Sequence, residues 1–229
     1  MDTEPAGKVV VFAASSLKDA FEDIAPGLAT KGIAEPEYNF GGSQALVAQL
    51  SQGAKADVFA SADSKSMEAA IEAGTVVSGT QQVLATNRLV VVVPGGQRLG
   101  LMSLKDLARP GLKLVLAEKS VPAGNYSLQI LDKLSAAPGY GQAFKEQVLA
   151  NVVSYENNVR QVLAKVQIGE ADAGIVYMTD AQSAGVANPN IKVDTIDIPA
   201  RYNVIARYYI APVKDAQNAD AASRYIAYV

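Results

Sequence analysis

The sequence contains neither cysteine nor histidine. Without cysteine it can form no disulfide, no thiol nucleophile and no thiolate metal site. Without histidine it can form neither a Ser-His-Asp triad nor an imidazole-ligated metal site. A metal could therefore not be bound by thiolate or imidazole, and an enzyme would have to rely on carboxylates, lysine or tyrosine. We also expect no cofactor and no metal bound directly by side chains.

The sequence also lacks an excess of basic charge. Its 20 Lys and Arg residues are outnumbered by 23 Asp and Glu, which gives a net charge of −3. Nucleic-acid-binding proteins usually carry a basic stripe, so we expect no nucleic-acid partner. Long apolar runs are missing too: Leu89–Val93 is far shorter than the roughly 18 residues that a membrane span requires.

The remaining composition is typical of a packed protein. Hydrophobic residues make up 49% of the 229 positions and charged residues 19%, so disorder is not expected. Residues 1–5, MDTEP, look like a start codon placed before a mature sequence. We expect that a secretory leader has been removed.

The stretch Val9–Ile24 shows how the chain is organised. Val9–Phe12 is an apolar, β-branched run that predicts a buried strand. Leu17, Phe21 and Ile24 then recur at helical spacing, directly after two serines. A serine at such a junction is a natural N-cap, and an N–H of the first turn that points into a cleft can bind an anion.

The same alternation of strand and helix continues along the chain. Further strands are predicted at Glu35–Phe40, Ala56–Ala60, Leu84–Val93, Lys113–Ala117, Val152–Tyr155, Ala173–Tyr177, Asp194–Ile198 and Tyr202–Pro212. Helices are predicted at Leu17–Ala29, from FGGSQAL to about Gln52, and at Ser64–Ala73, Ser103–Ala108, Asn125–Ser135, Gly141–Ala150, Val159–Ile168, Thr179–Ser183 and Asp220–Val229. This pattern predicts an α/β fold with parallel sheets.

Two crossings, near 83–86 and 197–202, divide the chain into lobes. We expect lobe I to comprise 1–83 and 199–229, with both termini, and lobe II to comprise the inserted residues 84–198.

Five positions are candidates for ligand binding, because each is expected to lie where a strand or loop meets a helix or the edge of a cleft. They are Ser16, Ser43, Ala123, Val159 and Tyr177. In open α/β sheets ligands bind outside the carboxyl ends of the strands. None of the five is charged, but each helix N-terminus is equivalent to roughly half a positive charge. A site made only of hydrogen-bond donors favours a fully ionised anion.

Six segments, in this order and spacing, carry a family resemblance: FAASSL, FGGSQAL, ADVFASAD, VPAGNY, ENNVRQVL and GIVYMTDA. Together they closely resemble the periplasmic molybdate-binding proteins of ABC transporters. The resemblance implies a type II periplasmic binding protein, with two α/β lobes, a two-strand hinge and a ligand cleft between the lobes.

The resemblance also assigns roles to the five positions. It implies hydroxyl and amide donors from Ser16 and Ser43, amide donors from Ala123 and Val159, and the hydroxyl of Tyr177. The resemblance further implies that the ligand is tetrahedral molybdate or tungstate. It also implies that the protein is a monomer and that it delivers this ligand to a membrane permease. Ser15 precedes Ser16 where relatives often have alanine, and we favour Ser16 as the ligand.

Other functions stay open at this point. Sulfate, phosphate and ferric iron are alternative ligands. Sulfate differs from molybdate mainly in size, which a sequence cannot measure, whereas a protonated phosphate would need an acceptor in the site. Ferric-binding relatives use clustered tyrosines, and here Tyr208 and Tyr209 are an adjacent pair that we expect to alternate across a strand. An enzyme could use Ser16 or Ser43 with Lys18 as base. The effector lobe of a transcription regulator is the remaining alternative.

Overall fold

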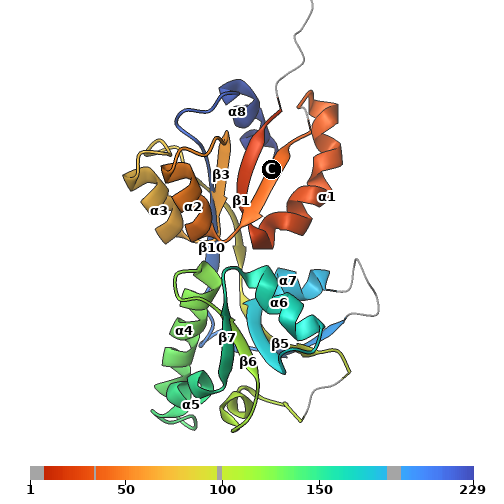
Figure 1. The fold of residues 1–229 in the computed structure, drawn as a ribbon, viewed down its shortest axis with the longest axis vertical. Helices are drawn as coiled ribbons and strands as arrows, with labels where there is room; N and C mark the ends of the chain where they lie inside the picture. The colour runs from red at the N-terminus through yellow and green to blue at the C-terminus, as the bar shows by residue number, and fades with distance from the viewer. Residues whose placement is uncertain (1–7, 34, 97–99, 185–191) are drawn as a thin grey trace, which may run out of the picture. The chain divides into compact units, whose positions relative to one another are not determined.

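The computed structural model describes residues 8–33, 35–96, 100–184 and 192–229. The chain forms two compact units, each with its own sheet and helices (Figure 1). Unit 1 comprises Met1–Thr86 and Arg207–Val229, and unit 2 comprises Asn87–Ala206. The first division lies at the end of the predicted crossing at 83–86, and the second lies a few residues beyond the predicted crossing at 197–202. Residues 1–5, which motivated the expectation of a leader, lie outside the described residues.

The strands are β1 (Val10–Ala14), β2 (Glu37–Gly41), β3 (Val58–Ser61), β4 (Gln82–Asn87), β5 (Leu89–Pro94), β6 (Leu114–Ala117), β7 (Val152–Glu156), β8 (Ala173–Tyr177), β9 (Val193–Asp197) and β10 (Ala206–Pro212). The α-helices are α1 (Lys18–Leu28), α2 (Ser43–Ser51), α3 (Ser64–Glu72), α4 (Pro122–Ser135), α5 (Phe144–Ala150), α6 (Val159–Gln167), α7 (Met178–Ser183) and α8 (Ala219–Tyr228). Short 3₁₀ turns cover Ser15–Leu17, Ala29–Lys31 and Leu104–Ala108.

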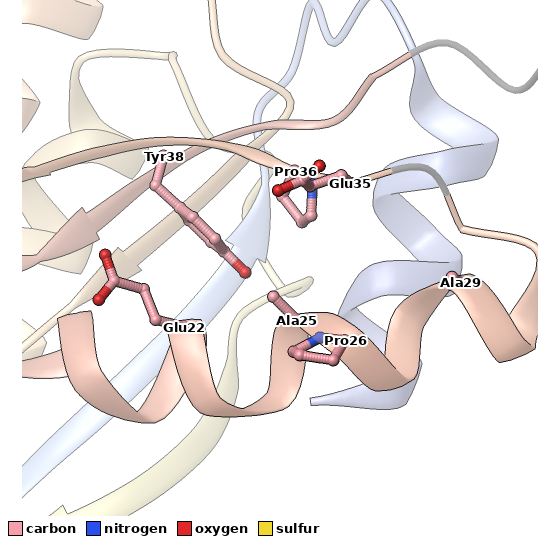
Figure 2. Close-up of a pocket in the computed structure, with 7 residues that line it drawn as sticks. All are labelled: Glu22, Ala25, Pro26, Ala29, Glu35, Pro36 and Tyr38. Carbon is pink, nitrogen blue, oxygen red and sulfur yellow. The ribbon is translucent and has the colours of Figure 1, made fainter.

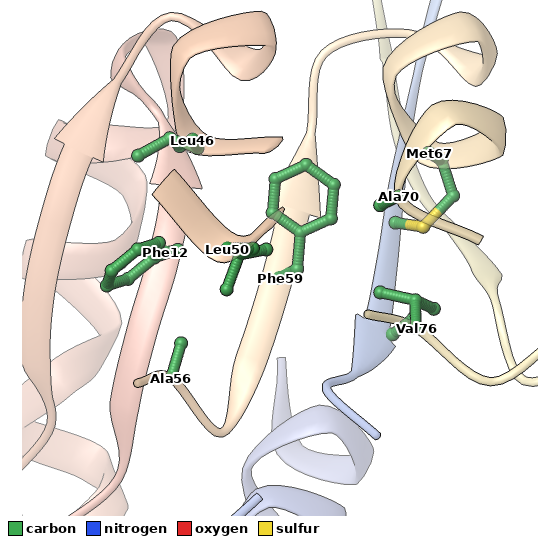
Figure 3. Close-up of a cluster of buried hydrophobic side chains, with 9 residues drawn as sticks. Phe12, Leu46, Leu50, Ala56, Phe59, Met67, Ala70 and Val76 are labelled. Carbon is green, nitrogen blue, oxygen red and sulfur yellow. The ribbon is translucent and has the colours of Figure 1, made fainter. Parts of the chain in front are cut away.

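The sheet of unit 1 has the order β2-β1-β3-β10-β4. Strand β1 runs parallel to both β2 and β3, whereas β10 is antiparallel to β3. The core between this sheet and the helices α2 and α3 is apolar (Figure 3). Phe12, Phe59, Leu46 and Leu50 meet there and are almost fully buried. Each such side chain stabilises the fold by about 1.5–3 kcal/mol relative to its exposed state.

The sheet of unit 2 has the order β7-β6-β8-β5-β9. Strand β6 is parallel to β7 and β8, and β5 is antiparallel to β8 and β9. Helix α6 packs on β8, β6 and β5. Gly174 of β8 permits this close packing, because a Cβ there would lie 2.9 Å from Val162 and 3.1 Å from Val166.

The α/β class is confirmed, but the prediction of wholly parallel sheets is wrong. The strands that break the parallel order, β5 and β10, are each the first strand after the chain passes from one unit into the other. A parallel strand is usually fed by a crossover helix. Neither β5 nor β10 has a helix before it within its unit, so nothing imposes the parallel direction.

Two predicted boundaries also differ from the structure. The predicted strand Leu84–Val93 is divided into β4 and β5. The predicted helix Asn125–Ser135 begins earlier, at Pro122, because proline is well suited to the first position of a helix. Ala123 therefore lies within the first turn of α4.

Candidate functional site

The turns that follow three neighbouring strands of unit 1 meet at one edge of its sheet. Strands β2, β1 and β3 are parallel, with Ala14 opposite Gly41 and Ala13 opposite Ala60. Their carboxyl ends therefore lie side by side. Ser16 follows β1 and Ser43 follows β2, so the structure brings these two predicted site residues to the same edge.

Ser43 is the first residue of α2 rather than its cap. Gly42 is the N-cap, and the buried hydroxyl of Ser43 instead accepts a hydrogen bond of 3.0 Å from the backbone N–H of Ala62. A hydroxyl has one proton and two acceptor lone pairs. Its proton is therefore available to an additional acceptor, as is the backbone N–H of Ser43, which has no acceptor within the helix.

Ser16 differs from the prediction in the same way. It lies in the 3₁₀ turn Ser15–Leu17, and α1 begins afterwards with no side-chain cap. The hydroxyl of Ser16 lies 2.9 Å from the hydroxyl of Tyr208 on β10, and both residues are buried. Neither α1 nor α2 has a side-chain cap, and the hydroxyls of Ser16 and Ser43 are each held by a residue distant in the sequence.

The enzyme alternative requires Lys18 to act on a serine. Lys18 instead has a half-exposed side chain whose amine lies 3.8 Å from Glu22, one turn further along α1. Ser16, by contrast, is 7% exposed. The structure therefore gives the proposed serine–lysine pair no support.

Unit 2 also has an edge where the ends of three parallel strands meet. Strands β7, β6 and β8 are neighbours, with Ala117 opposite Glu156 and Val115 opposite Gly174. Helix α4 follows β6, helix α6 follows β7, and Tyr177 is the last residue of β8. The three remaining predicted site residues therefore lie at this edge. Tyr177 is 1% exposed.

Helix α4 presents two backbone donors in its first turn. Pro122 is the first residue and has no N–H, so the amides of Ala123 and Gly124 are the first-turn donors. Gly124 is packed directly against the end of β6. A Cβ at this position would lie 2.0 Å from the carbonyl oxygen of Glu118 and 2.4 Å from that of Ala117. The glycine therefore lets the first turn approach the edge of the sheet.

Helix α6 is capped by Asn158, whose side chain accepts a hydrogen bond of 3.1 Å from the N–H of Gln161. This cap satisfies the third amide of the helix. The N–H of Val159, the first residue, has no acceptor within the helix. Val159 is buried, and its apolar side chain anchors the start of α6 while its backbone supplies a donor.

Ionised side chains at this edge are held in ion pairs. Arg160 Nε lies 2.9 Å from Oδ1 of Asp180, whose side chain is fully buried, and Arg160 also donates to Ser183. This ion pair joins the first turn of α6 to α7, which directly follows Tyr177. A buried carboxylate neutralises the guanidinium, so Arg160 does not present an unbalanced positive charge.

Glu156, the last residue of β7, is paired with Lys165 of α6 at 2.7 Å and accepts a hydrogen bond from Ser154. Burial by itself raises the pKa of Glu156. The hydrogen bonds from Lys165 and Ser154 and the charge of Lys165 outweigh burial, and the pKa lies below its ordinary value. The carboxylate therefore stays ionised and balanced by the lysine.

A cavity of about 560 Å³ in unit 1 lies elsewhere (Figure 2). Its lining comes from α1 and the 3₁₀ turn after it, from the two residues before β2 and from the beginning of β2, at the opposite end of the strand from Ser43: Glu22, Ala25, Pro26, Ala29, Glu35, Pro36 and Tyr38. Burial raises the pKa of the Tyr38 phenol, and the charges of Glu22 and Glu35 raise it further, against a lowering hydrogen bond from Tyr225. Two carboxylates make this cavity unsuitable for an anion.

Sequence reasoning missed the residues that hold the candidate donors in place. These are Tyr208, the backbone of Ala62, Gly124 and the pair Arg160–Asp180. A buried position on a strand could have singled out Tyr208, but no local pattern connects it with Ser16.

Within the described part of the chain, no three acidic, cysteine or histidine side chains form a cluster that could hold a metal ion. No described helix has the length and apolar character to cross a membrane.

Comparison with solved structures supports the description of the fold. The periplasmic molybdate-binding protein of Azotobacter vinelandii matches with a TM-score of 0.81 and 22% identity, over 96% of this chain and 92% of that one. The sulfate-binding protein SubI from Mycobacterium tuberculosis matches with a TM-score of 0.83 and 16% identity, over 96% and 80%. At these identities the likeness concerns the fold alone.

Two curated relatives found by sequence comparison have higher sequence identity to this chain than these two solved structures. The molybdate-binding protein ModA of Mycobacterium bovis is 38% identical over 99% of this chain and 80% of its own length. ModA of Escherichia coli is 33% identical over 96% of this chain and 82% of its own length. A family model described as bacterial extracellular solute-binding protein matches residues 9–229. The chain therefore belongs to the family of bacterial extracellular solute-binding proteins.

Proposed function

We propose that this protein is the binding component of an ABC transporter and that it captures molybdate, or tungstate, as a tetrahedral dianion. Two lines of support converge on this ligand. Relatives at 38% and 33% identity are named molybdate-binding proteins and align over nearly the whole chain. Independently, both sheet edges carry neutral donors at the positions where α/β proteins bind ligands.

The observation that carries the proposal is the hydrogen bond that the Ser43 hydroxyl accepts within the protein. It already accepts a hydrogen bond from Ala62, so what it offers a ligand is its proton. The amides of Ser43, Ala123 and Val159 also offer only protons. A set of pure donors suits an oxyanion that carries no proton of its own, and molybdate, tungstate and sulfate satisfy this at neutral pH.

Neutral donors can hold a double negative charge without a cationic side chain. Helices α2, α4 and α6 each place an N-terminus at one of the two edges, and each terminus is equivalent to roughly half a positive charge. Hydrogen bonds to a charged group contribute about 1.5–3 kcal/mol each. Arg160 and Lys165 are balanced by carboxylates and do not need to contact the anion.

We further propose the cellular role that accompanies this ligand. The donors that we assign to the ligand are Ser16 and Ser43 of unit 1 and Ala123, Val159 and Tyr177 of unit 2. The protein works as a periplasmic monomer, passes its ligand to a membrane permease, needs no cofactor and catalyses no reaction.

A calorimetric titration of the purified protein with molybdate, tungstate, sulfate and phosphate tests the proposal. We expect tight binding of molybdate and tungstate and much weaker binding of phosphate. A ligand at one hundred times its Kd stabilises the folded state by about 2.7 kcal/mol, so the melting temperature should rise clearly. Failure of both oxometalates to bind would refute the function, and tight binding of sulfate alone would reassign the ligand.

Two substitutions test the named residues. Ser43→Ala and Tyr177→Phe should each weaken molybdate binding by about tenfold or more, because each removes a hydrogen bond to a charged group. Ser51→Ala is the matched control: Ser51 lies at the other end of α2, and its hydroxyl only donates to the carbonyl of Val47. Unchanged affinity in Ser43→Ala and Tyr177→Phe would remove both residues from the site.

A further inference from the structure

The hydrogen bond between Ser16 and Tyr208 has a direction that the proposed function determines. The two oxygens lie 2.9 Å apart, and the residues are 7% and 2% exposed. One hydroxyl must donate and the other accept. Ser16 has a single proton, and if that proton goes to the ligand, the proton in this bond must come from Tyr208. A phenol is also the more acidic of the two groups and hence the better donor.

We propose that Tyr208 is a positioning residue that determines which oxyanions unit 1 accepts; this inference rests on the proposed function. By donating to Ser16, Tyr208 directs the serine proton toward the ligand. Ser16 then meets the ligand as a donor. A ligand that carries its own proton, such as hydrogen phosphate, would need an acceptor at this place instead.

Ser43 shows the same arrangement with a different partner. Its oxygen accepts from the N–H of Ala62, which is the role that our proposal gives to the oxygen of Ser16 toward Tyr208. Both serines thus receive a hydrogen bond from the protein and present a proton at the edge. The O–H of a protonated oxyanion would meet donors there, and a polar group left without its hydrogen bond in a buried site costs about 1–3 kcal/mol.

The position of Tyr208 on β10 explains why this tyrosine can reach Ser16. Strand β10 is antiparallel to β3, with Tyr209 opposite Ser61, the last residue of β3. Tyr208 therefore lies just beyond the carboxyl end of β3, at the edge that holds the serines. Tyr208 is buried and its neighbour Tyr209 is half-buried, as expected for residues that alternate across a strand.

The alternation provides a matched control. We expect Tyr208→Phe to weaken molybdate binding about tenfold, because Ser16 loses the partner that orients its proton. Phosphate, measured by competition against molybdate, should be weakened less or should gain affinity, because the Ser16 proton can turn away and the Ser16 oxygen can accept from the O–H of hydrogen phosphate. The ratio of molybdate to phosphate affinity should then fall about tenfold or more. Tyr209→Phe should leave both affinities within about twofold.

A double-mutant cycle with Ser16→Ala provides a second measurement. Once Ser16 has no hydroxyl, the further change Tyr208→Phe should alter molybdate affinity less than twofold. Thermal unfolding of each variant confirms that it is folded. Equal weakening of both anions by Tyr208→Phe, behaviour like that of Tyr209→Phe, or additive effects in the cycle would overturn the inference. If the wild-type protein bound no oxyanion, the proposed function itself would fail, which is a distinct result.

Discussion

The two units build their candidate edges from different kinds of donor. Unit 1 offers the hydroxyls of Ser16 and Ser43, and unit 2 offers the amides of Ala123 and Val159 together with the hydroxyl of Tyr177. An amide of the first helical turn points along the helix axis, so the helix itself fixes its direction. A serine hydroxyl rotates, and its proton has a direction only if another group fixes it.

This difference determines which residues support each edge. In unit 1 the supporting groups are hydrogen-bond partners of the hydroxyls, namely Tyr208 and the N–H of Ala62. In unit 2 they are groups that hold the beginnings of helices in place: Gly124 under α4 and the Arg160–Asp180 pair beside α6. Single-atom changes should therefore damage the edge of unit 1, whereas changes of packing or charge should damage that of unit 2.

The largest expected effect is that of Arg160→Met. The substitution keeps much of the side chain's bulk but removes the guanidinium that pairs with the fully buried Asp180. Breaking a buried ion pair by removal of one partner costs about 3–5 kcal/mol. Urea unfolding should show a loss of this size, and molybdate affinity should fall because the first turn of α6 is no longer tied to α7.

Two controls separate the charge effect from a general loss of packing. The double variant Arg160→Met with Asp180→Asn removes the buried charge and should recover part of the lost stability. Arg88 and Asp197 form an exposed pair of similar length, 3.1 Å, and Arg88→Met should change stability by less than about 1 kcal/mol. Equal losses in Arg160→Met and Arg88→Met would show that the Arg160–Asp180 pair does not support unit 2.

The next effect concerns a glycine in each unit. Gly124→Ala would place a Cβ 2.0 Å from a backbone carbonyl, which cannot move without the end of β6. Such overpacking costs about 1–3 kcal/mol, and molybdate affinity should fall because the Ala123 amide is displaced. Gly27→Ala in α1 is the control. Its Cβ would also lie 2.0 Å from an atom, but that atom is the terminal hydroxyl of Tyr228, which can rotate away.

The two glycine variants are compared by urea unfolding and by titration with molybdate. Gly27→Ala should be tolerated, and alanine is also the better helix former by about 1 kcal/mol. If Gly124→Ala were equally mild in stability and affinity, the close approach of α4 to β6 would not be needed at this edge.

Much of the fold was predictable because the signals are local. The run at Ala173–Tyr177 was predicted with the bounds that β8 has, since apolar, strand-forming residues lie between turn residues. The cap at Asn158 is also a local feature, because asparagine is a favoured residue before the first turn of a helix. The positions of Ser16, Ser43, Ala123, Val159 and Tyr177 at strand ends also follow from this pattern.

The partners of the site residues were not predictable, because they depend on tertiary structure. Ser16 and Tyr208 are 192 positions apart, and only the antiparallel placement of β10 brings them together. The sequence alone predicts a serine cap at α1 and α2, since isolated helices favour one. In the folded chain each serine hydroxyl could bond either to a backbone N–H of its helix or to a partner across the sheet edge. The structure shows the bond to the partner, Tyr208 for Ser16 and the N–H of Ala62 for Ser43.

The smallest expected effect is electrostatic and concerns Glu156 in unit 2. Its pKa is lowered despite burial, through the hydrogen bonds from Lys165 and Ser154 and the lysine charge. A carboxylate whose pKa is lower in the folded than in the unfolded state contributes stability above its unfolded pKa, about 4.3 for glutamate. This contribution is lost as the pH falls from there through the folded pKa. For an ion pair with a partly exposed lysine we expect less than about 1 kcal/mol.

Urea unfolding between pH 3 and 7 should show the wild type more stable than Glu156→Gln near neutral pH, with the difference shrinking below about pH 4. Lys165→Met should lose the same pH-dependent part, because it removes the group that keeps Glu156 ionised. A difference that stayed constant over the whole pH range would mean that Glu156 supports α6 by packing alone. The charge balance at the edge of unit 2 would then depend on Arg160 and Asp180.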